Sequence, residues 1–406
     1  MKVLYITNND LSENYGGSMG CFKFTKGLDL LYQNSNIDHY LIVSFSDKHS
    51  GSLKMNEHEL VIGNIISGTK RRILVRVHGN LSQLALSYKE LLNHLGKYEP
   101  DVVILQNSFL GDLANLIRRI FPRTIIIGHF DNFEYECYKA TIGKANVVAR
   151  QLRKAIDLPL IKRLEKLYLK NIDFATFLTT KDKNSVFSFY NISTPWTLFP
   201  IMIPDPLSSD DVPITVTGKN CRKVVFTGSL DYCPNIEAAM FLDQNSNIIR
   251  KYLGASTEII LAGKNPDSKV RNLQNVRVIP NPSNSELKEL MLSSDLFISP
   301  VFQGSGMKVK VMDALAYGLP IVASEHSLTG YESITEKAFI FPFRDRNSNA
   351  FENALSNAKD VLETKDRATA FKIQRELFRD FFSIYNAERT LLGILKDLTK
   401  EEAISK

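Results

Sequence analysis

Residues 302–323 read FQGSGMKVKVMDALAYGLPIVA, and this stretch decides the fold class of the C-terminal half of the chain. It follows a strand-like run at 295–299, and it closes with Gly318 and Pro320, residues that typically end a helix before the next strand. The pattern predicts a strand, a glycine-rich loop, a short helix and a second buried strand. In such a unit the helix N-terminus and the glycines before it form a candidate site for an anion.

Two lysines begin the predicted helix. Lys308 and Lys310 fall in its first turns, where the helix dipole disfavours a positive charge. A bound diphosphate would remove that conflict, which favours an anion site. A second interpretation stays open, in which both lysines are solvated and Lys310 pairs with Asp313, an interaction worth about 0.3 kcal/mol.

The bulk composition narrows the class of protein. A chain of 406 residues is too long for one core, and its 44% hydrophobic and 23% charged residues are typical of soluble globular proteins. The N-terminus enters a strand pattern without a signal peptide, and no apolar run is long enough to span a bilayer. The four cysteines and seven histidines are scattered, so we expect a cytoplasmic, reduced protein without a metal.

The positive charge is concentrated in residues 144–170. Eight basic residues face two acidic ones there, an excess equal to the net charge of +6 of the whole chain. Leucines interleave at helical spacing, and Pro159 is expected to kink or split the helix. Such a helix can lie on the inner face of an anionic membrane, but the favoured interpretation is a solvated outer face on a helix whose apolar stripe packs on its own domain. Nucleic acid is not an expected partner, because Tyr168 is the only interleaved aromatic residue.

Strand and helix patterns alternate along both halves, which predicts two doubly wound parallel sheets of α/β class with a cleft between the domains. In the first half we expect strands at 2–7, 40–45, 102–106, 124–129 and 174–179, and helices at 19–32, 81–95, 112–121 and 150–171. In the second half we expect strands at 223–227, 258–262, 276–279, 296–299 and 320–323, and helices at 235–250, 285–293, 347–364 and 368–398.

A stretch rich in Pro, Ser and Asp near 195–216 reads as the linker between the halves. We therefore assign an N-terminal Rossmann-like domain to 1–198, the linker to 199–222, a C-terminal Rossmann-like domain to 223–385, and a terminal helix to 386–406.

Glycines follow several predicted strands, where ligands of doubly wound sheets bind. Gly228, Gly263 and Gly304 occupy equivalent strand ends in the second half and suggest a shared ligand rim. In the first half, Gly16, Gly17 and Ser18 fall between the first strand and the first helix. They do not complete a G-x-G-x-x-G motif, and no acidic residue follows at the ribose position, so a dinucleotide oxidoreductase is not expected.

Three C-terminal segments resemble one family. Residues 304–315, 225–235 and 260–266 are similar to the donor-binding segments of GT-B glycosyltransferases, of the retaining "glycosyl transferases group 1" (family four) type found in bacterial capsule and lipopolysaccharide clusters. Residues 130–139, FDNFEYECYK, are similar to a His-Asn-x-Glu-Tyr segment of related capsule enzymes. The resemblance covers nearly the whole chain.

This resemblance implies a hexosyltransferase without cofactor or metal. The second domain would hold a nucleotide-diphosphate sugar as co-substrate, and the first would hold a glycan or lipid-linked acceptor. The terminal helix would cross back to the first domain. Retaining members are thought to use the leaving diphosphate as the base toward the acceptor hydroxyl, while the protein orients the groups and stabilises charge.

The resemblance also implies the site residues. Lys308 and the backbone near Gly306 would bind the diphosphate, and Asp313 would accept hydrogen bonds from the ribose hydroxyls. Further donor-binding positions are Gly228, Ser229, Lys264, Gly304, Ser305, Met307 and Lys310. Acceptor or cleft positions are Gly16, Gly17 and Ser18, and the candidate catalytic pair is Asp131 with His129.

Three departures from the family pattern matter. Ser305 stands where the first of two glutamates is common, the loop 228–235 lacks a basic residue, and Asp131 stands where a histidine is expected. Asp131 and His129 also fit a pair that only bonds locally. Two other functions therefore stay open: a non-catalytic GT-B-like subunit that binds glycan or a partner, and a sugar-nucleotide epimerase. The histidine and carboxylate set expected of the epimerase is not found.

Overall fold

A computed structural model of the chain describes residues 1–12, 16–46, 52–63, 68–142, 147–208, 211–212, 222–304, 306–346, 348–364 and 367–404. It divides into two compact units. Unit 1 comprises Met1–Ile203 with Ile384–Lys406, and unit 2 comprises Pro204–Ser383.

Unit 1 is built on a sheet with the strand order β3-β4-β2-β1-β5-β6-β7-β8 in its described residues. All neighbouring strands are parallel except the β3–β4 pair. The strands are β1 (Lys2–Thr7), β2 (His39–Ser46), β3 (Ser52–Asn56), β4 (Glu59–Gly63), β5 (Val102–Gln106), β6 (Ile125–Phe130), β7 (Phe174–Phe177) and β8 (Trp196–Leu198).

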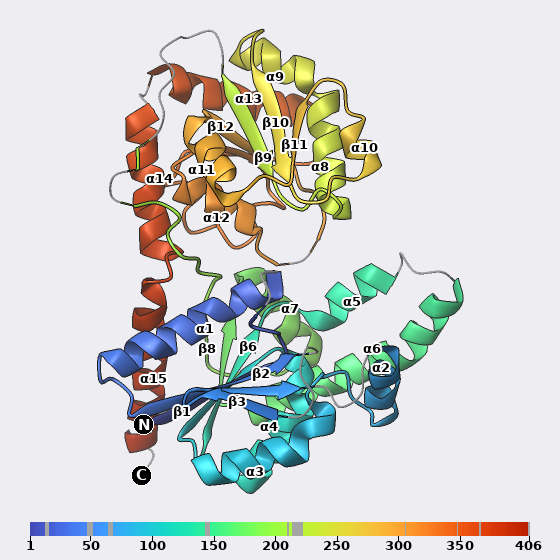
Figure 1. The fold of residues 1–406 in the computed structure, drawn as a ribbon, viewed down its shortest axis with the longest axis vertical. Helices are drawn as coiled ribbons and strands as arrows, with labels where there is room; N and C mark the ends of the chain where they lie inside the picture. Colours follow the sequence, from blue (N-terminus) through green and yellow to red (C-terminus); the bar gives the residue numbers. More distant parts are fainter. Residues whose placement is uncertain are drawn as a thin grey trace. The chain divides into compact units, whose positions relative to one another are not determined.

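Helices cover both faces of this sheet (Figure 1). They are α1 (Gly16–Gln33), α2 (Gly68–Val77), α3 (Tyr88–Tyr98), α4 (Gly111–Ile120), α5 (Glu134–Ile142), α6 (Val147–Asn171), α7 (Thr180–Tyr190) and α15 (Asn386–Ile404), with short 3-10 turns η1 (Ala85–Ser87) and η2 (Ser108–Leu110). Because side chains alternate along a strand, β1 sends Leu4 and Ile6 into one core and Val3 and Tyr5 into the other.

The terminal helix α15 belongs to unit 1 and lies beside α1 (Figure 1). Its apolar side chains, among them Leu391 and Leu395, share one core cluster with Leu28 and Leu31 of α1. The two helices are in contact at Gly27, where a Cβ would lie 3.4 Å from the backbone of Ala387.

Unit 2 is built on an all-parallel sheet with the order β11-β10-β9-β12-β13-β14 in its described residues. The strands are β9 (Lys223–Thr227), β10 (Glu258–Gly263), β11 (Arg277–Pro280), β12 (Leu296–Ser299), β13 (Ile321–Ser324) and β14 (Ile340–Phe343). The helices are α8 (Cys233–Gln244), α9 (Ser246–Leu253), α10 (Ser268–Arg271), α11 (Asn284–Ser293), α12 (Val309–Ala316), α13 (Ser348–Thr364) and α14 (Arg367–Phe381).

Several predicted helices differ from the observed ones. α6 runs through Pro159 as one helix, so of the kink or split expected there the split does not occur. The helix expected at 235–250 divides at Asn245 into α8 and α9. The helix expected at 368–398 also divides, because Ile384 donates its backbone N–H to the carbonyl of Ile203 and turns the chain into α15.

The predicted linker also differs from the structure. Residues 199–203 pack into unit 1, where Phe199 and Met202 are core residues. The prediction failed because these two apolar residues lie in a stretch whose Pro and Asp content is typical of a linker.

Candidate functional site

The loop between β12 and α12 closes on itself through Lys308. This residue precedes the first turn of α12, and its Nζ donates to the carbonyl oxygens of Gly304 (3.1 Å) and Gly306 (2.8 Å). The hydroxyl of Tyr331 donates to the Lys308 carbonyl at 3.0 Å, and Nε2 of His326 lies 2.7 Å from the Gly304 carbonyl oxygen. Lys308 therefore holds the loop shape in this structure.

Lys310 reaches from the first turn of α12 to the loop that follows β9. Its Nζ donates to Oδ1 of Asn235 and lies 4.2 Å from the ring centroid of Phe226. A Cβ on Gly228 would lie 2.9 Å from this Nζ, and the φ of +152° at Gly228 also favours glycine. The predicted glycine thus makes room for the lysine.

Lys310 and Asp313 are partly buried one helical turn apart. Burial lowers the pKa of Lys310 to about 7, and the neighbouring Lys308 charge acts in the same direction. Burial raises the pKa of Asp313 to about 7. No ion pair joins the two among the described residues, so the local pairing considered from the sequence is not formed. An anion beside Lys310 would favour its charged form.

The other predicted donor-binding residues differ in how exposed they are at this sheet edge. A Cβ on Gly263 would lie 1.7 Å from the Gly228 carbonyl oxygen, so these two strand ends touch. Ser229 and Lys264 are exposed beside them, whereas the side chain of Met307 is buried and packs in the domain. Ser305 lies outside the described residues.

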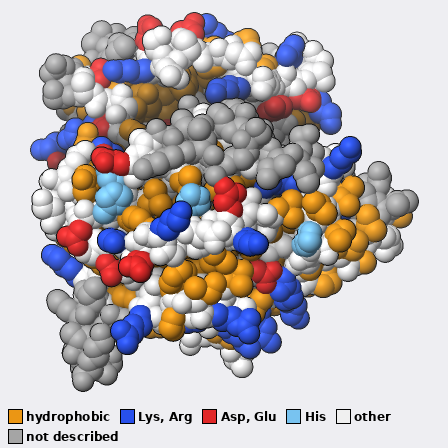
Figure 2. Space-filling view, turned by 60° about the horizontal axis from the view of Figure 1, so that its bottom comes forward, with side chains coloured by type: hydrophobic (Ala, Val, Ile, Leu, Met, Phe, Trp, Pro, Cys, Tyr) orange, Lys and Arg blue, Asp and Glu red, His pale blue; other side chains and the backbone are white. Residues whose placement is uncertain are grey.

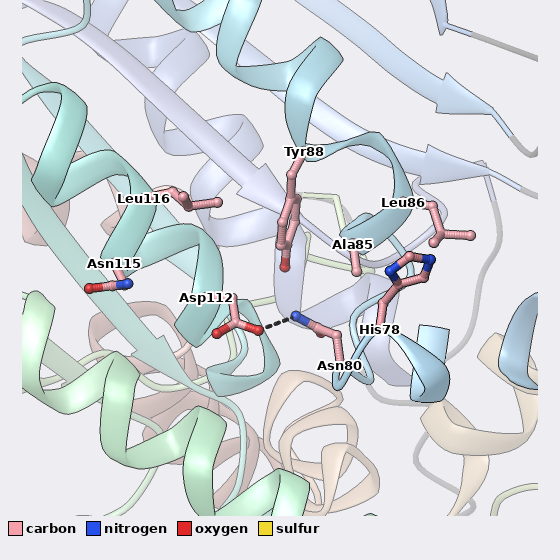
Figure 3. Close-up of a pocket in the computed structure, with 8 residues that line it drawn as sticks. All are labelled: His78, Asn80, Ala85, Leu86, Tyr88, Asp112, Asn115 and Leu116. Atoms are coloured by element: carbon pink, nitrogen blue, oxygen red, sulfur yellow. Dashed lines mark hydrogen bonds between the residues drawn. The ribbon is translucent and has the colours of Figure 1, made fainter. Parts of the chain in front are cut away.

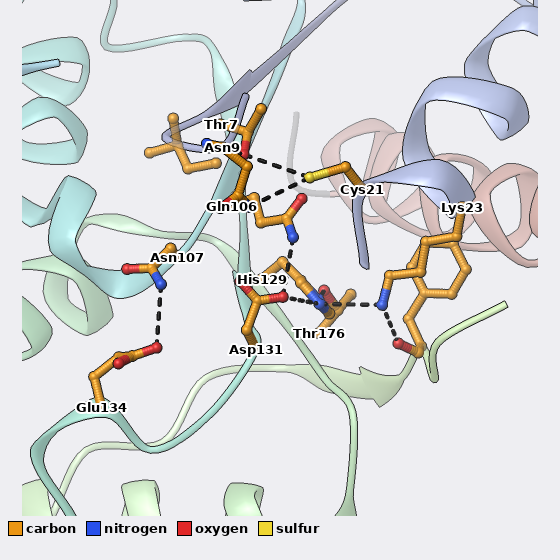
Figure 4. Close-up of polar contacts among 12 residues, drawn as sticks. Thr7, Asn9, Cys21, Lys23, Gln106, Asn107, His129, Asp131, Glu134 and Thr176 are labelled. Atoms are coloured by element: carbon orange, nitrogen blue, oxygen red, sulfur yellow. Dashed lines mark hydrogen bonds and ion pairs between the residues drawn. The ribbon is translucent and has the colours of Figure 1, made fainter. Parts of the chain in front are cut away.

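Unit 1 holds a second polar cluster, at the end of β6 (Figure 4). His129 is fully buried, with Nε2 3.1 Å from Nζ of Lys23 and Nδ1 2.7 Å from Oγ1 of Thr176. Asp131 follows the strand, accepts from Nε2 of Gln106 at 2.9 Å, and has an Oδ1 3.5 Å from the His129 ring. The side chain of Asp131 is 19% exposed, whereas that of His129 is 0% exposed. Only the aspartate of the predicted pair therefore reaches the surface of unit 1.

Burial governs the charges in this cluster. It lowers the pKa of Lys23 to about 7 and the pKa of His129 to about 4, which leaves the imidazole neutral at pH 7. Burial alone would raise the pKa of Asp131. Contacts with His129, Lys23 and Gln106 outweigh that effect and hold the pKa of Asp131 below its usual value.

Two glutamates lie next to this cluster, Glu165 fully buried and Glu134 partly buried. Burial raises the pKa of Glu134 to about 8 and that of Glu165 to about 7, and the charge of Glu165 adds to the shift at Glu134. Glu165 accepts the backbone N–H groups of Glu134 (3.1 Å) and Tyr135 (3.2 Å), so it caps the N-terminus of α5. Its position is explained by the fold.

A polar cavity of about 450 Å³ opens elsewhere in unit 1 (Figure 3). Asp112 is held there by Asn80 (2.7 Å) and by both terminal nitrogens of Arg163 (2.8 Å each). The hydroxyl of Tyr88 is buried near Asn80 and Ser82, but it forms no hydrogen bond of acceptable geometry within the described part of the chain. The lining residues are His78, Asn80, Ala85, Leu86, Tyr88, Asp112, Asn115 and Leu116.

The C-terminal half of the chain matches a known protein family. A search of curated protein sequences gives no significant match. Residues 221–359, about a third of the chain, match the model of the family "Glycosyl transferases group 1". The chain carries a glycosyl transferases group 1 domain. This match places it among the glycosyltransferases.

Solved structures extend the similarity to the fold of the whole glycosyltransferase chain. Sucrose-phosphate synthase from Thermosynechococcus elongatus is 13% identical, with a TM-score of 0.66 over 98% of this chain and 99% of that chain. A glycosyltransferase from Rickettsia africae is 14% identical, with a TM-score of 0.62 over 98% of each chain. Anabaena HepE, solved with UDP and glucose, is 12% identical, with a TM-score of 0.58 over 98% of this chain and 100% of that chain. The fold is GT-B, with two Rossmann-like domains.

The group 1 domain brings together the predicted positions Gly228, Gly304, Gly306, Lys308 and Lys310 at one sheet edge. The positions Gly16, Gly17 and Ser18 of unit 1 lie in the first turn of α1, and not in the loop before it as the sequence suggested.

Sequence reasoning missed Asn235 as the partner of Lys310, and it missed Lys23, Tyr88 and Asp112 in unit 1. One signal for Lys23 was available, because it lies on the apolar stripe of α1 beside Phe24.

Proposed function

We propose that this glycosyltransferase moves a hexose from a nucleotide-diphosphate sugar to a hydroxyl of a glycan or lipid-linked acceptor, with retention of anomeric configuration, in bacterial surface polysaccharide synthesis. One observation carries the proposal. The N-terminus of α12, Lys310 and the glycine loop at Gly228 converge at the carboxyl edge of a parallel sheet, inside the group 1 domain.

The diphosphate of the donor binds at this edge of unit 2. Backbone N–H groups of the first turn of α12 and the ammonium of Lys310 supply positive potential, and Lys308 keeps the loop closed. Asp313 lies one turn further along α12 and accepts hydrogen bonds from the ribose hydroxyls. The complex of Anabaena HepE with UDP and glucose supports a nucleotide as the ligand of this fold.

The acceptor binds to unit 1. Asp131 offers a partly exposed carboxylate at the end of β6, and the cavity at Tyr88 and Asp112 offers polar groups with apolar walls, which suits a sugar ring. During transfer the acceptor oxygen bonds to the anomeric carbon while the bond from that carbon to the diphosphate breaks. The acceptor proton passes to an oxygen of the released diphosphate. The step therefore balances without a cofactor.

A lipid-linked acceptor would place the enzyme in the cytoplasm at the inner face of a membrane. No helix in the described part of the chain is long and apolar enough to cross a bilayer. The basic segment 144–170 is the part proposed to contact the membrane surface, because eight basic residues face two acidic ones there.

Thermal unfolding with added nucleotides tests the donor site. The matching nucleotide diphosphate, UDP or GDP, at 100 times its dissociation constant should add about 2.7 kcal/mol to the free energy of unfolding. If no nucleoside diphosphate raises the melting temperature, the transferase proposal fails. Screening a panel of nucleotide sugars for donor consumption then identifies the sugar.

Asp313→Asn tests the ribose contact. The wild type should bind UDP, if that is the matching nucleotide, about tenfold more tightly than 2′-deoxy-UDP, because a hydrogen bond to a charged group is lost. Asp313→Asn should bind both nucleotides with similar, weaker affinity. Equal discrimination by the variant and the wild type in calorimetric titration would exclude Asp313 from the ribose site.

A further inference from the structure

Exposed apolar side chains gather on α2 and on the first half of α6. Ile73 and Val77 of α2 are 58% and 76% exposed, and Leu152 and Ile156 of α6 are 60% and 39% exposed. Val147, at the start of α6, is 66% exposed. Single exposed apolar residues are normal, but a group on two neighbouring helices marks an interaction surface.

Basic side chains border the same area. Lys70 and Arg72 of α2 are exposed, and so are Arg153 and Lys154 of α6. α2 contains no acidic residue, and the acidic residue within 147–157, Asp157, is buried and neutralised by Arg76 at 2.7 and 3.0 Å. On the side where Figure 1 draws α2 and α6, Figure 2 shows apolar side chains bordered by basic ones.

A groove of about 600 Å³ joins the two helices. The side chains that line it include Arg72 and Ile73 from α2 and Leu152, Arg153 and Ile156 from α6. Guanidinium groups and apolar side chains therefore share one concave surface. An acidic soluble partner would account for the cations, but it would leave the exposed isoleucines and leucine without an apolar contact. A lipid headgroup with its acyl chain matches both.

The second half of α6 is built differently. Ile161, Leu164 and Leu169 are buried in unit 1, while Lys166 and Lys170 are exposed without neighbouring exposed apolar side chains on that helix. This half is an ordinary packed helix with a solvated face. The described part of the basic segment, residues 147–170, thus has an exposed apolar and basic first half and a packed second half.

We propose that α2 and the first half of α6 form a docking surface for an anionic phospholipid bilayer, which we call the α2/α6 surface (Arg72, Ile73, Leu152, Arg153, Lys154, Ile156). Its apolar side chains enter the headgroup layer, and its cations lie at the lipid phosphates. This inference rests on the membrane association proposed above and narrows it to one part of α6 together with α2. It does not depend on transfer chemistry.

Vesicle sedimentation with the full-length protein tests the surface in the absence of donor and acceptor. The protein should bind vesicles of phosphatidylglycerol mixed with phosphatidylcholine, bind pure phosphatidylcholine weakly, and dissociate from the anionic vesicles as salt rises. Equal binding to both vesicle types, or to neither, overturns the proposal. The nucleotide-induced rise in melting temperature is measured on the same samples, so failure of the membrane surface and failure of the donor site are told apart.

A matched pair of charge variants locates the surface. R153Q/K154Q and K166Q/K170Q each remove two positive charges from α6. The first should weaken binding to anionic vesicles about 25-fold, at about fivefold for each charge near the lipid surface. The second should change binding little. Equal weakening by both variants would show that only the overall charge matters, and the proposal would be wrong.

A second pair tests the apolar contribution. The double variant Ile73→Ser with Leu152→Ser should weaken vesicle binding roughly tenfold. This figure assumes that each of the two side chains is half buried in the bilayer. Ile120→Ser, at a side chain of α4 that is 52% exposed, serves as the control. Both variants should keep the wild-type unfolding midpoint, because the side chains are exposed. Full vesicle binding by the double variant would contradict insertion.

Discussion

Two lysines, one in each unit, have the same lowered pKa in different surroundings. Lys23 of unit 1 and Lys310 of unit 2 both lie at the carboxyl edge of a parallel sheet, and burial lowers the pKa of each to about 7. Lys23 is fully buried and donates to the Phe199 carbonyl (2.6 Å), with Nε2 of His129 at 3.1 Å. Lys310 is only partly buried, and among the described residues Asn235 alone accepts from it.

The difference lies in how much hydrogen-bonding capacity is left. An ammonium has three N–H donors. Lys23 directs its donors at groups of its own domain, so it holds α1 against β6 and the segment at Phe199. Lys310 has one acceptor among the described residues, which leaves N–H donors for the phosphate proposed above, and the backbone of Gly228 lies next to it. The two lysines therefore share a lowered pKa but differ in the number of acceptors around them, and this difference supports the ligand contact proposed for Lys310.

The largest expected effect is on nucleotide binding. Lys310→Met should weaken binding of the matching nucleoside diphosphate by up to a hundredfold, because a charge-assisted hydrogen bond to phosphate is lost. Lys23→Met should leave this affinity unchanged. Calorimetric titration of both variants makes the comparison. Lys372→Met removes an exposed lysine of α14, outside the predicted donor-binding positions, and is the control, with an expected change below about twofold. An unaltered affinity in Lys310→Met would remove it from the phosphate site.

The free energy of unfolding should respond more to Lys23→Met than to Lys310→Met. Lys23→Met leaves the Phe199 carbonyl and Nε2 of His129 buried without their donor, which should lower the free energy of unfolding by about 1–3 kcal/mol. Lys310→Met removes a partly buried charge with one partner and should leave the unfolding midpoint nearly unchanged. Urea unfolding of the two variants decides the point. A stable Lys23→Met with impaired nucleotide binding would mean that the roles were assigned the wrong way round.

The smallest effect is the pH dependence of nucleotide binding. Lys310 has a pKa of about 7 in the free protein, so its charge is present below that pH and is lost as pH rises above it. Above about pH 7.5 the terminal phosphate is already ionised, since its pKa is about 6. Affinity should then fall by at most roughly tenfold per pH unit. In Lys310→Met the affinity should depend on pH only through the titration of Asp313, and this dependence should be weaker. An identical slope in the variant would show that another group titrates.

The sequence predicted the central strands best. β1, β5, β9 and β12 were expected at the residues where they occur, because buried parallel strands are short runs of apolar residues bounded by polar ones. The strands β3 and β4, which form an antiparallel pair, were missed. So was β8, in which Trp196 and Leu198 are each 39% exposed. β8 lies at the edge of the sheet and buries less, so its sequence carries a weaker pattern. β4 is an inner strand, but its buried apolar run, residues 60–62, is short.

The sequence by itself determined that the chain has two parallel α/β halves and that the glycine and lysine segment near 304–313 lies at the N-terminus of a helix. Local patterns suffice for this, because strand and helix periodicity are properties of neighbouring residues. Only the tertiary structure showed which acceptors each lysine has. Lys310 meets Asn235 across 75 residues of chain, and His129 meets Lys23 across 106. Such contacts depend on how strands and helices pack, which no local pattern records.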